Sequence, residues 1–101
     1  MVKVTISRGE NKTSLHVKGH AGSGPINHDL VCSAVSAILF GGMNALANPK
    51  DYDIKISEGD VLLKGDLNSH DKDVIEVVIT QLKTIEESYP SNIKIVEKGL
   101  D

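Results

Sequence analysis

Residues 30–47 constrain the fold most, because they form the longest mainly apolar stretch of the chain. Serines, glycines and an asparagine interrupt this stretch, so it is too short and too broken for a membrane span. Asn27 and Asp29 are both good N-cap residues, and Pro49 disfavours helical geometry in the residue before it. We therefore predict a helix from near Asp29 to near Ala47. Its apolar residues cover most of its circumference, which predicts a central, buried helix.

Two adjacent glycines, Gly41 and Gly42, lie inside this predicted helix. Glycine lowers helix propensity, so we expect the helix to make close contact with another backbone there. A second helix is predicted to begin at Asn68 or Ser69, which can cap it, and to end near Ser88. Its apolar residues form one stripe, as in a helix with one buried face.

Alternating apolar and polar residues predict five short strands. They are centred on residues 2–6, 15–17, 52–56, 61–64 and 93–96. His16 alternates with the apolar residues of its strand and is expected to face solvent, and His70, at a helix start, is expected to be exposed. The order β-β-α-β-β-α-β predicts an α/β fold, an α+β sandwich of two helices on a mostly antiparallel, mixed sheet. The length of 101 residues fits a single domain, residues 1–101.

Charge and composition narrow the classes of partner. The net charge is −3, and acidic and basic residues are mixed along the sequence. Without a basic block or interleaved aromatic residues, we expect no direct contact with nucleic acid. The N-terminus alternates like a strand and lacks the apolar core of a signal peptide, and one cysteine forms no internal disulfide. These features favour the cytoplasm and no membrane association.

Cys32, the chain's single cysteine, is the candidate nucleophile. If Asp29 is the N-cap, Cys32 lies in the first helical turn, where the helix dipole stabilises a thiolate. An ordinary thiol pKa of about 8.5 can fall by a unit or more beside a helix N-terminus and a histidinium. A lone cysteine on an apolar helix is, however, more often a small buried hydrophobe than a nucleophile.

His20 is the candidate general base, twelve residues before Cys32. The end of a strand and the start of the next helix commonly meet at one edge of a sheet, so His20 could take the thiol proton and return it to a leaving amine. Backbone N–H groups at Cys32 and Ser33 could bind the oxyanion. Asp29 and Ser36 share a helix face with Cys32, and Asp29 either orients His20 or only caps the helix.

A metal site is the weaker interpretation of the same segment. His20, His28, Asp29 and Cys32 all carry possible zinc-ligand atoms. Their spacing matches no familiar zinc motif, and no second cysteine is present. We therefore predict no metal and no cofactor.

Four segments together resemble the Prp family, the small bacterial ribosomal-processing cysteine proteases. They are GHA at 19–21, DLVCSAVS at 29–36, FGGMNAL at 40–46 and TIEESY at 84–89. The resemblance implies that His20 and Cys32 form the catalytic dyad and that Gly19, Asp29 and Ser36 belong to the active-site motif. It also implies a homodimer. The implied substrate is the N-terminal extension of ribosomal large-subunit protein twenty-seven, cut after a short segment with paired aromatic residues.

The loop between the two dyad positions would then cover the substrate cleft. It contains Gly22, Gly24, Pro25 and Asn27. Asn27 stands where members of the family often carry glycine, and asparagine tolerates left-handed backbone geometry better than most residues. Two rival functions are a non-catalytic, ribosome-associated binding module with an inert buried cysteine, and a thiol-dependent esterase or amidase acting on small molecules.

Overall fold

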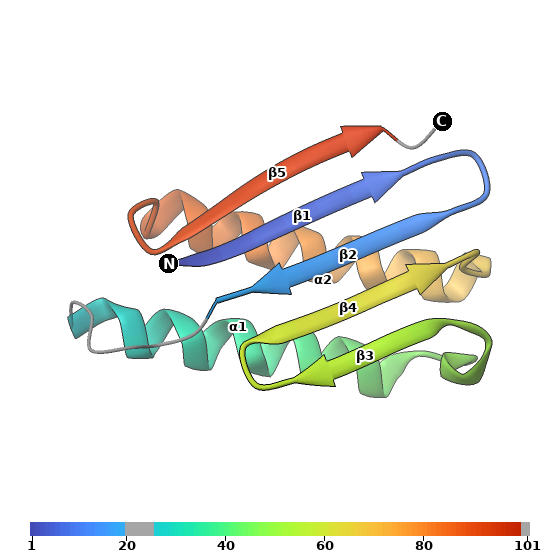
Figure 1. Cartoon of the computed structure of the whole chain (residues 1–101), viewed down its shortest axis with the longest axis horizontal. Helices are drawn as coiled ribbons and strands as arrows, with labels where there is room; N and C mark the ends of the chain where they lie inside the picture. Colours follow the sequence, from blue (N-terminus) through green and yellow to red (C-terminus); the bar gives the residue numbers. More distant parts are fainter. Residues whose placement is uncertain (20–25, 100–101) are drawn as a thin grey trace.

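The computed structural model describes residues 1–19 and 26–99, with the backbone alone for residues 26–29. The elements follow in the predicted order β-β-α-β-β-α-β (Figure 1). The strands are β1 (Val2–Arg8), β2 (Thr13–Lys18), β3 (Asp53–Ser57), β4 (Asp60–Gly65) and β5 (Ile93–Gly99). The helices are α1 (Ile26–Ala45), the short 3₁₀ helix η1 (Pro49–Asp51) and α2 (Ser69–Ser88).

The five strands form one mixed sheet in the order β3-β4-β2-β1-β5. All neighbours are antiparallel except β1 and β5, which are parallel. Figure 1 shows α1 and α2 on the same face of this sheet, so the described residues form two layers and place no helix on the other face. The predicted two-helix sandwich on a mixed sheet is confirmed.

The core lies between the sheet and the two helices. Because side chains alternate along a strand, every second residue of each strand points to the helices. The buried apolar side chains of this core come from β1, β2, β4 and β5, from both helices and from the segments that follow α1 and β4. They are Val2, Val4, Ile6, Leu15, Val17, Val31, Val35, Leu39, Leu46, Val61, Leu63, Leu67, Ile75, Val78, Ile79, Leu82 and Ile93.

Helix α1 differs from the prediction at both ends. It begins at Ile26, three residues before Asp29, and ends at Ala45 rather than Ala47. Asn27 and Asp29 therefore lie inside the helix, and the prediction that either caps it was wrong. Cys32 is the seventh helical residue and lies in the second turn, beyond the first turn in which a helix dipole acts most strongly.

The prediction that α1 is a central, buried helix was also wrong. Val31, Val35 and Leu39 are buried against the sheet, but Leu30 is 57% exposed and Phe40 is 43% exposed. A two-layer fold covers a helix on one side only, so the apolar residues on the far side of α1 meet no sheet. The apolar circumference of α1 thus exceeds what a single copy of the chain buries.

The two glycines of α1 have different surroundings. A Cβ at Gly42 would collide with Cγ2 of Val78 on α2, whereas a Cβ at Gly41 would meet no described atom within 4 Å. The expected close contact thus exists at Gly42, where the neighbour is a side chain rather than a backbone. At Gly41 the expectation was wrong.

A buried carboxylate ties the end of α1 to the start of α2. The Asn68 side chain caps α2, as predicted, by accepting a hydrogen bond of 2.8 Å from the backbone N–H of Asp71. Asp71 is fully buried. Its carboxylate accepts hydrogen bonds from the backbone N–H groups of Ala47 and Asn48, the Tyr52 hydroxyl and the His70 ring. The His70 side chain itself is 61% exposed, in line with the prediction.

Burial alone would favour the neutral form of Asp71, but these hydrogen bonds to the charged form outweigh it. The pKa of the Asp71 carboxyl is therefore held well below its ordinary value. The charged carboxylate joins the chain that leaves α1 to the first turn of α2, so it sets how the two helices sit on the sheet.

Candidate active site

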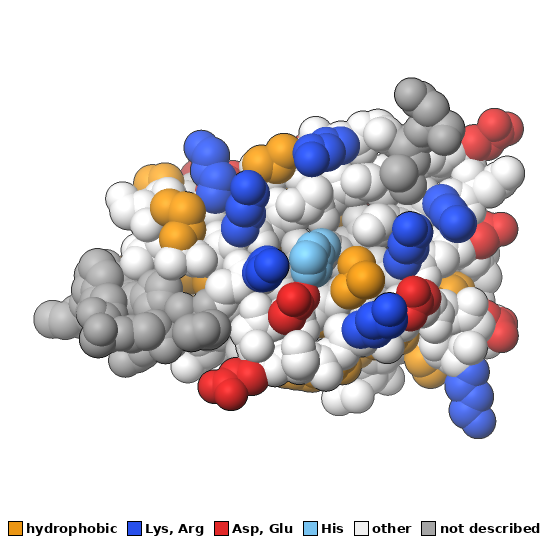
Figure 2. All heavy atoms as spheres, in the orientation of Figure 1, with side chains coloured by type: hydrophobic (Ala, Val, Ile, Leu, Met, Phe, Trp, Pro, Cys, Tyr) orange, Lys and Arg blue, Asp and Glu red, His pale blue; other side chains and the backbone are white. Residues whose placement is uncertain are grey.

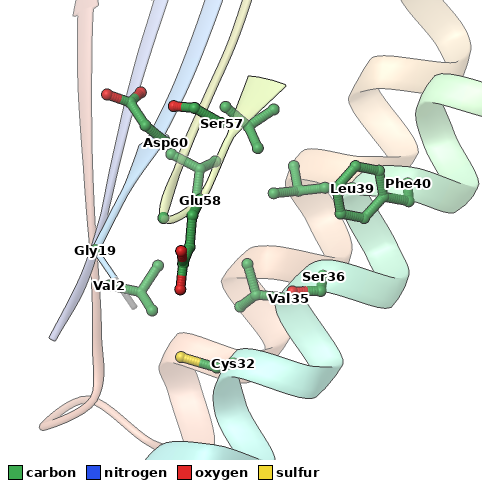
Figure 3. A pocket seen from close by; sticks show the side chains of 13 residues that line it. Val2, Gly19, Cys32, Val35, Ser36, Leu39, Phe40, Ser57, Glu58 and Asp60 are labelled. Atoms are coloured by element: carbon green, nitrogen blue, oxygen red, sulfur yellow. The ribbon is translucent and has the colours of Figure 1, made fainter. Parts of the chain in front are cut away.

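A pocket of about 280 Å³ opens between α1 and the turn that joins β3 to β4 (Figure 3). Its walls combine apolar residues of α1 and the sheet with the polar residues of that turn. The lining residues are Val2, Val17, Gly19, Cys32, Val35, Ser36, Leu39, Phe40, Ser57, Glu58, Gly59, Asp60 and Val61. Three predicted site residues, Gly19, Cys32 and Ser36, are thus brought together although they come from two different elements of the chain.

Cys32 lies on the α1 wall of this pocket. It is half-buried and packs against the hydrophobic core, one residue after the buried Val31. Figure 3 shows its sulfur pointing from α1 into the pocket. The thiol is therefore neither sealed in the core nor fully exposed, and a group that enters the pocket meets it.

Gly19 directly follows β2 and lies at the pocket rim. Its φ is +114°, a conformation that L side chains rarely adopt, and a Cβ there would collide with the Met1 carbonyl oxygen. Its N–H donates a hydrogen bond of 2.9 Å to the Gly59 carbonyl, which ties the end of β2 to the β3–β4 turn. Only glycine fits this position, so the first residue of the Gly19-His20 pair has a definite structural role.

The two serines near Cys32 differ in position. Ser36, one helical turn after Cys32, lines the pocket. Ser33 is not among the lining residues, and both serines are exposed. The backbone N–H groups of Cys32 and Ser33 lie beyond the first four residues of α1, so helical hydrogen bonds already use them. This start of α1 removes the argument for an oxyanion site at these two amides, which depended on a helix starting at Asp29.

Nothing in the sequence predicted that the β3–β4 turn lines the pocket. Glu58, Gly59 and Asp60 were recognised as a turn, but nothing in the sequence placed them opposite α1. Figure 3 shows the Glu58 side chain extending into the pocket on the side that faces α1. Asp60 instead pairs with His16 on the outer face of the sheet, at 2.6 Å. The pocket therefore combines an apolar wall with a carboxylate at its rim.

The other predicted site residues lie outside what the structure describes. His20, Gly22, Gly24 and Pro25 fall in the range 20–25, and Asn27 and Asp29 contribute only their helical backbone. Among the described residues no three His, Cys, Asp or Glu side chains are grouped to hold a metal ion. No helix within the described ranges is long and apolar enough to cross a membrane.

A family model described as cysteine protease Prp matches residues 1–94. The chain belongs to this family. The ribosomal processing cysteine protease Prp of Mycoplasma genitalium (strain G37) is 33% identical, over the full length of both chains. The protein of the same name from Staphylococcus aureus (strain Mu50) is 31% identical over 100 residues, which are 93% of this chain and 94% of that protein.

A solved structure has the same fold as this member of the Prp family. It is the essential ribosomal processing protease Prp from S. aureus in complex with a covalently linked product peptide. The match has a TM-score of 0.81 at 30% identity and covers 97% of this chain and 100% of that one. The family assignment makes the chain a cysteine protease, and it confirms the expected enzyme class and fold.

Proposed function

We propose that this Prp-family protease uses Cys32 as its nucleophile and His20 as its general base and acid. The observation that carries the proposal is that Cys32 faces a pocket whose rim contains Gly19, the residue bonded directly to His20. The structure of the S. aureus relative, which holds a covalently linked product peptide, supports covalent chemistry in this family.

In this mechanism His20 accepts the thiol proton of Cys32. The thiolate attacks the peptide carbonyl, and the tetrahedral intermediate collapses to a thioester as the histidinium gives its proton to the leaving amine. Water, deprotonated by His20, then hydrolyses the thioester and frees the acid product. Because Cys32 lies in the second turn of α1, the helix dipole contributes little, and the reaction depends on a side-chain base.

Oxyanion stabilisation requires donors other than the amides of Cys32 and Ser33. We assign this role to the hydroxyl of Ser36, because Ser36 lines the same pocket one helical turn from Cys32. Asp29 belongs to α1 but does not cap it, so we assign Asp29 the role of orienting His20.

The substrate we propose is the N-terminal extension of ribosomal large-subunit protein twenty-seven. The relatives are named ribosomal processing proteases, which supports a ribosomal protein as substrate. The pocket supports a large apolar side chain near the cut, since Val35, Leu39 and Phe40 form its α1 wall. An aromatic substrate side chain would gain both burial and ring contact with Phe40.

We further propose a cytoplasmic homodimer with a loop that covers the cleft. Leu30 and Phe40 leave apolar surface on α1 that a second copy can cover. The loop would contain Gly22, Gly24 and Pro25 and would lead to Asn27 in the first turn of α1. A cytoplasmic location follows from the ribosomal processing role of the relatives.

The test is cleavage of the host's own ribosomal precursor by the purified chain. Cys32→Ala should abolish cleavage, whereas Ser33→Ala, at the exposed neighbouring position, should leave the rate within about twofold. Undiminished cleavage by Cys32→Ala would refute the assignment. If the wild type cleaves no precursor and its thiol is inert, the protein is a non-catalytic, ribosome-associated module instead.

A further inference from the structure

The open face of the sheet gathers lysines that lie far apart in the sequence. We call the strand residues whose side chains point away from the helices the outward face. It holds six lysines and two aspartates, and all six lysines are exposed. The lysines are Lys3, Lys18, Lys55, Lys64, Lys94 and Lys98. Figure 2 shows basic side chains spread across this face, with a histidine near its centre. A chain with a net charge of −3 thus has one strongly basic surface.

Strand register places three of these lysines in one row. Lys3 of β1 is the partner of Lys94 on β5 and of Lys18 on β2. Adjacent strands are about 4.8 Å apart, so the three ammonium groups project side by side within about 10 Å. The row ends at Asp60 on β4, whose carboxylate is already paired with His16.

Such a row is electrostatically unfavourable in the protein alone, because like charges on directly opposite strand positions destabilise a sheet. The ion pairs formed within the described residues use Arg8, Lys83, His16 and His70, and none of them involves a lysine of the outward face. Arg8 and Lys83 pair on the helix side of the sheet with Glu76 and Glu97. Two outward lysines do have an acidic strand partner, since Asp53 is opposite Lys64 and Asp60 is opposite Lys18. Lys3 and Lys94 have none, and six lysines against two aspartates leave the face with an excess of four positive charges.

The chemistry of this face suits an extended phosphate backbone rather than a single anionic group. The face carries no arginine, whose planar fork binds one carboxylate or one phosphate bidentately, so its lysines act as a row of point charges. No Phe, Tyr or Trp stands at an outward strand position, so the face has neither a base-stacking platform nor an aromatic anchor for a protein or a membrane. What it offers is a regular set of ammonium groups for a phosphate backbone.

We propose that the outward face of the sheet binds the phosphate backbone of RNA, without reading its sequence. This site lies on the side of the sheet opposite the pocket of Cys32, so RNA and a peptide substrate can be bound together. The absence of a basic block in the sequence argued against nucleic acid, but that argument does not hold once alternate residues of five strands share one face. The proposal is independent of the protease reaction.

Binding to a fluorescein-labelled RNA duplex of mixed sequence, followed by anisotropy against salt concentration, tests the proposal. The variant K3Q/K18Q/K94Q removes the row. Its matched control, K12Q/K50Q/K72Q, removes the same charge from exposed lysines off the outward face. We expect the row variant to bind at least tenfold more weakly at low salt, and its plot of log K against log salt to be shallower by about two to three units. The control should stay within about twofold of the wild type.

Thermal unfolding checks that the row variant is folded. The Tm of the variant should not fall below that of the wild type, because the change relieves repulsion between lysines. If the triple variant is unstable, Lys94→Gln alone should reduce the salt slope by about one unit. Equal weakening in both triples, or no binding by the wild type, would overturn the proposal. So would tighter binding of polyglutamate or of phosphatidylglycerol vesicles than of RNA, since either would assign the face to another class of anion.

Discussion

The two adjacent glycines of α1 should respond in opposite directions to the same substitution. Gly41→Ala adds a methyl group that meets no described atom within 4 Å, whereas Gly42→Ala drives one into Cγ2 of Val78. Neither glycine has a positive φ, so alanine fits the backbone at both positions. The pair therefore isolates the packing of α1 against α2, which fixes the helix that carries Cys32.

The expected magnitudes follow from propensity and packing. Alanine in place of glycine inside a helix gains about 0.8–1 kcal/mol, so Gly41→Ala should stabilise the protein by about that amount. At Gly42 the same gain is opposed by overpacking that costs about 1–3 kcal/mol. Val78 is buried and β-branched, so its methyl cannot swing away, and we place the cost at about 2–3 kcal/mol. The net loss is then about 1–2 kcal/mol. The two variants should differ by about 10 °C or more in Tm.

Urea unfolding and thermal unfolding of both single variants measure this difference. The double variant Gly42→Ala with Val78→Ala gives a second check, because it removes the colliding methyl. Its stability should exceed the sum of the two single effects by about 1–2 kcal/mol. If the two glycine variants shift stability equally, α1 does not approach α2 at Gly42, and the helix packing described above is incorrect.

Three further changes test the remaining features of the structure. Asp71→Asn should lower Tm at pH 7 by several degrees. Because the pKa of Asp71 is depressed in the folded state, the difference in Tm between wild type and variant should shrink as the pH falls below about 4. A difference in Tm that stays constant down to pH 2 would contradict this. Gly19→Ala should lower the free energy of unfolding, measured in urea, by about 1–3 kcal/mol, because alanine is strained at this φ and its Cβ meets the Met1 carbonyl. It should also reduce kcat/KM for peptide cleavage more than Gly41→Ala does. Glu58→Gln removes a negative charge from the pocket. The ratio of the Cys32 alkylation rate by anionic iodoacetate to the rate by neutral iodoacetamide should therefore rise about twofold or more. An unchanged ratio would place Glu58 away from the thiol.

The order of elements was predictable because each follows from local pattern. Alternation in β1 and β4 and the Asn68 cap of α2 are short-range signals, and the structure agrees with them. The start of α1 was not predictable, because residues 26–29 offer two good capping side chains and the helix begins before both of them. The exposure of Leu30 and Phe40 was missed for a different reason: an apolar circumference does not tell how many layers a fold has.

The site was predictable only where its residues are close in sequence. Cys32 and Ser36 share a helix face by their spacing, and Gly19 ends the preceding strand. Glu58 reaches the pocket through the pairing of β3 with β4 and of β4 with β2, a long-range arrangement that the local pattern does not encode. The lysine row of the outward face depends on register in the same way.

The central claim is that His20 activates Cys32, and the pH dependence of Cys32 alkylation tests it most directly. The chain has no other cysteine, so iodoacetamide reports on this thiol alone. We expect the wild type to react readily at neutral pH and His20→Ala to react at least tenfold more slowly there. His70→Ala changes an exposed histidine at the start of α2 and serves as the control. Its Cys32 should be alkylated at the wild-type rate. Equal alkylation rates in the wild type and His20→Ala across the pH range would contradict the account.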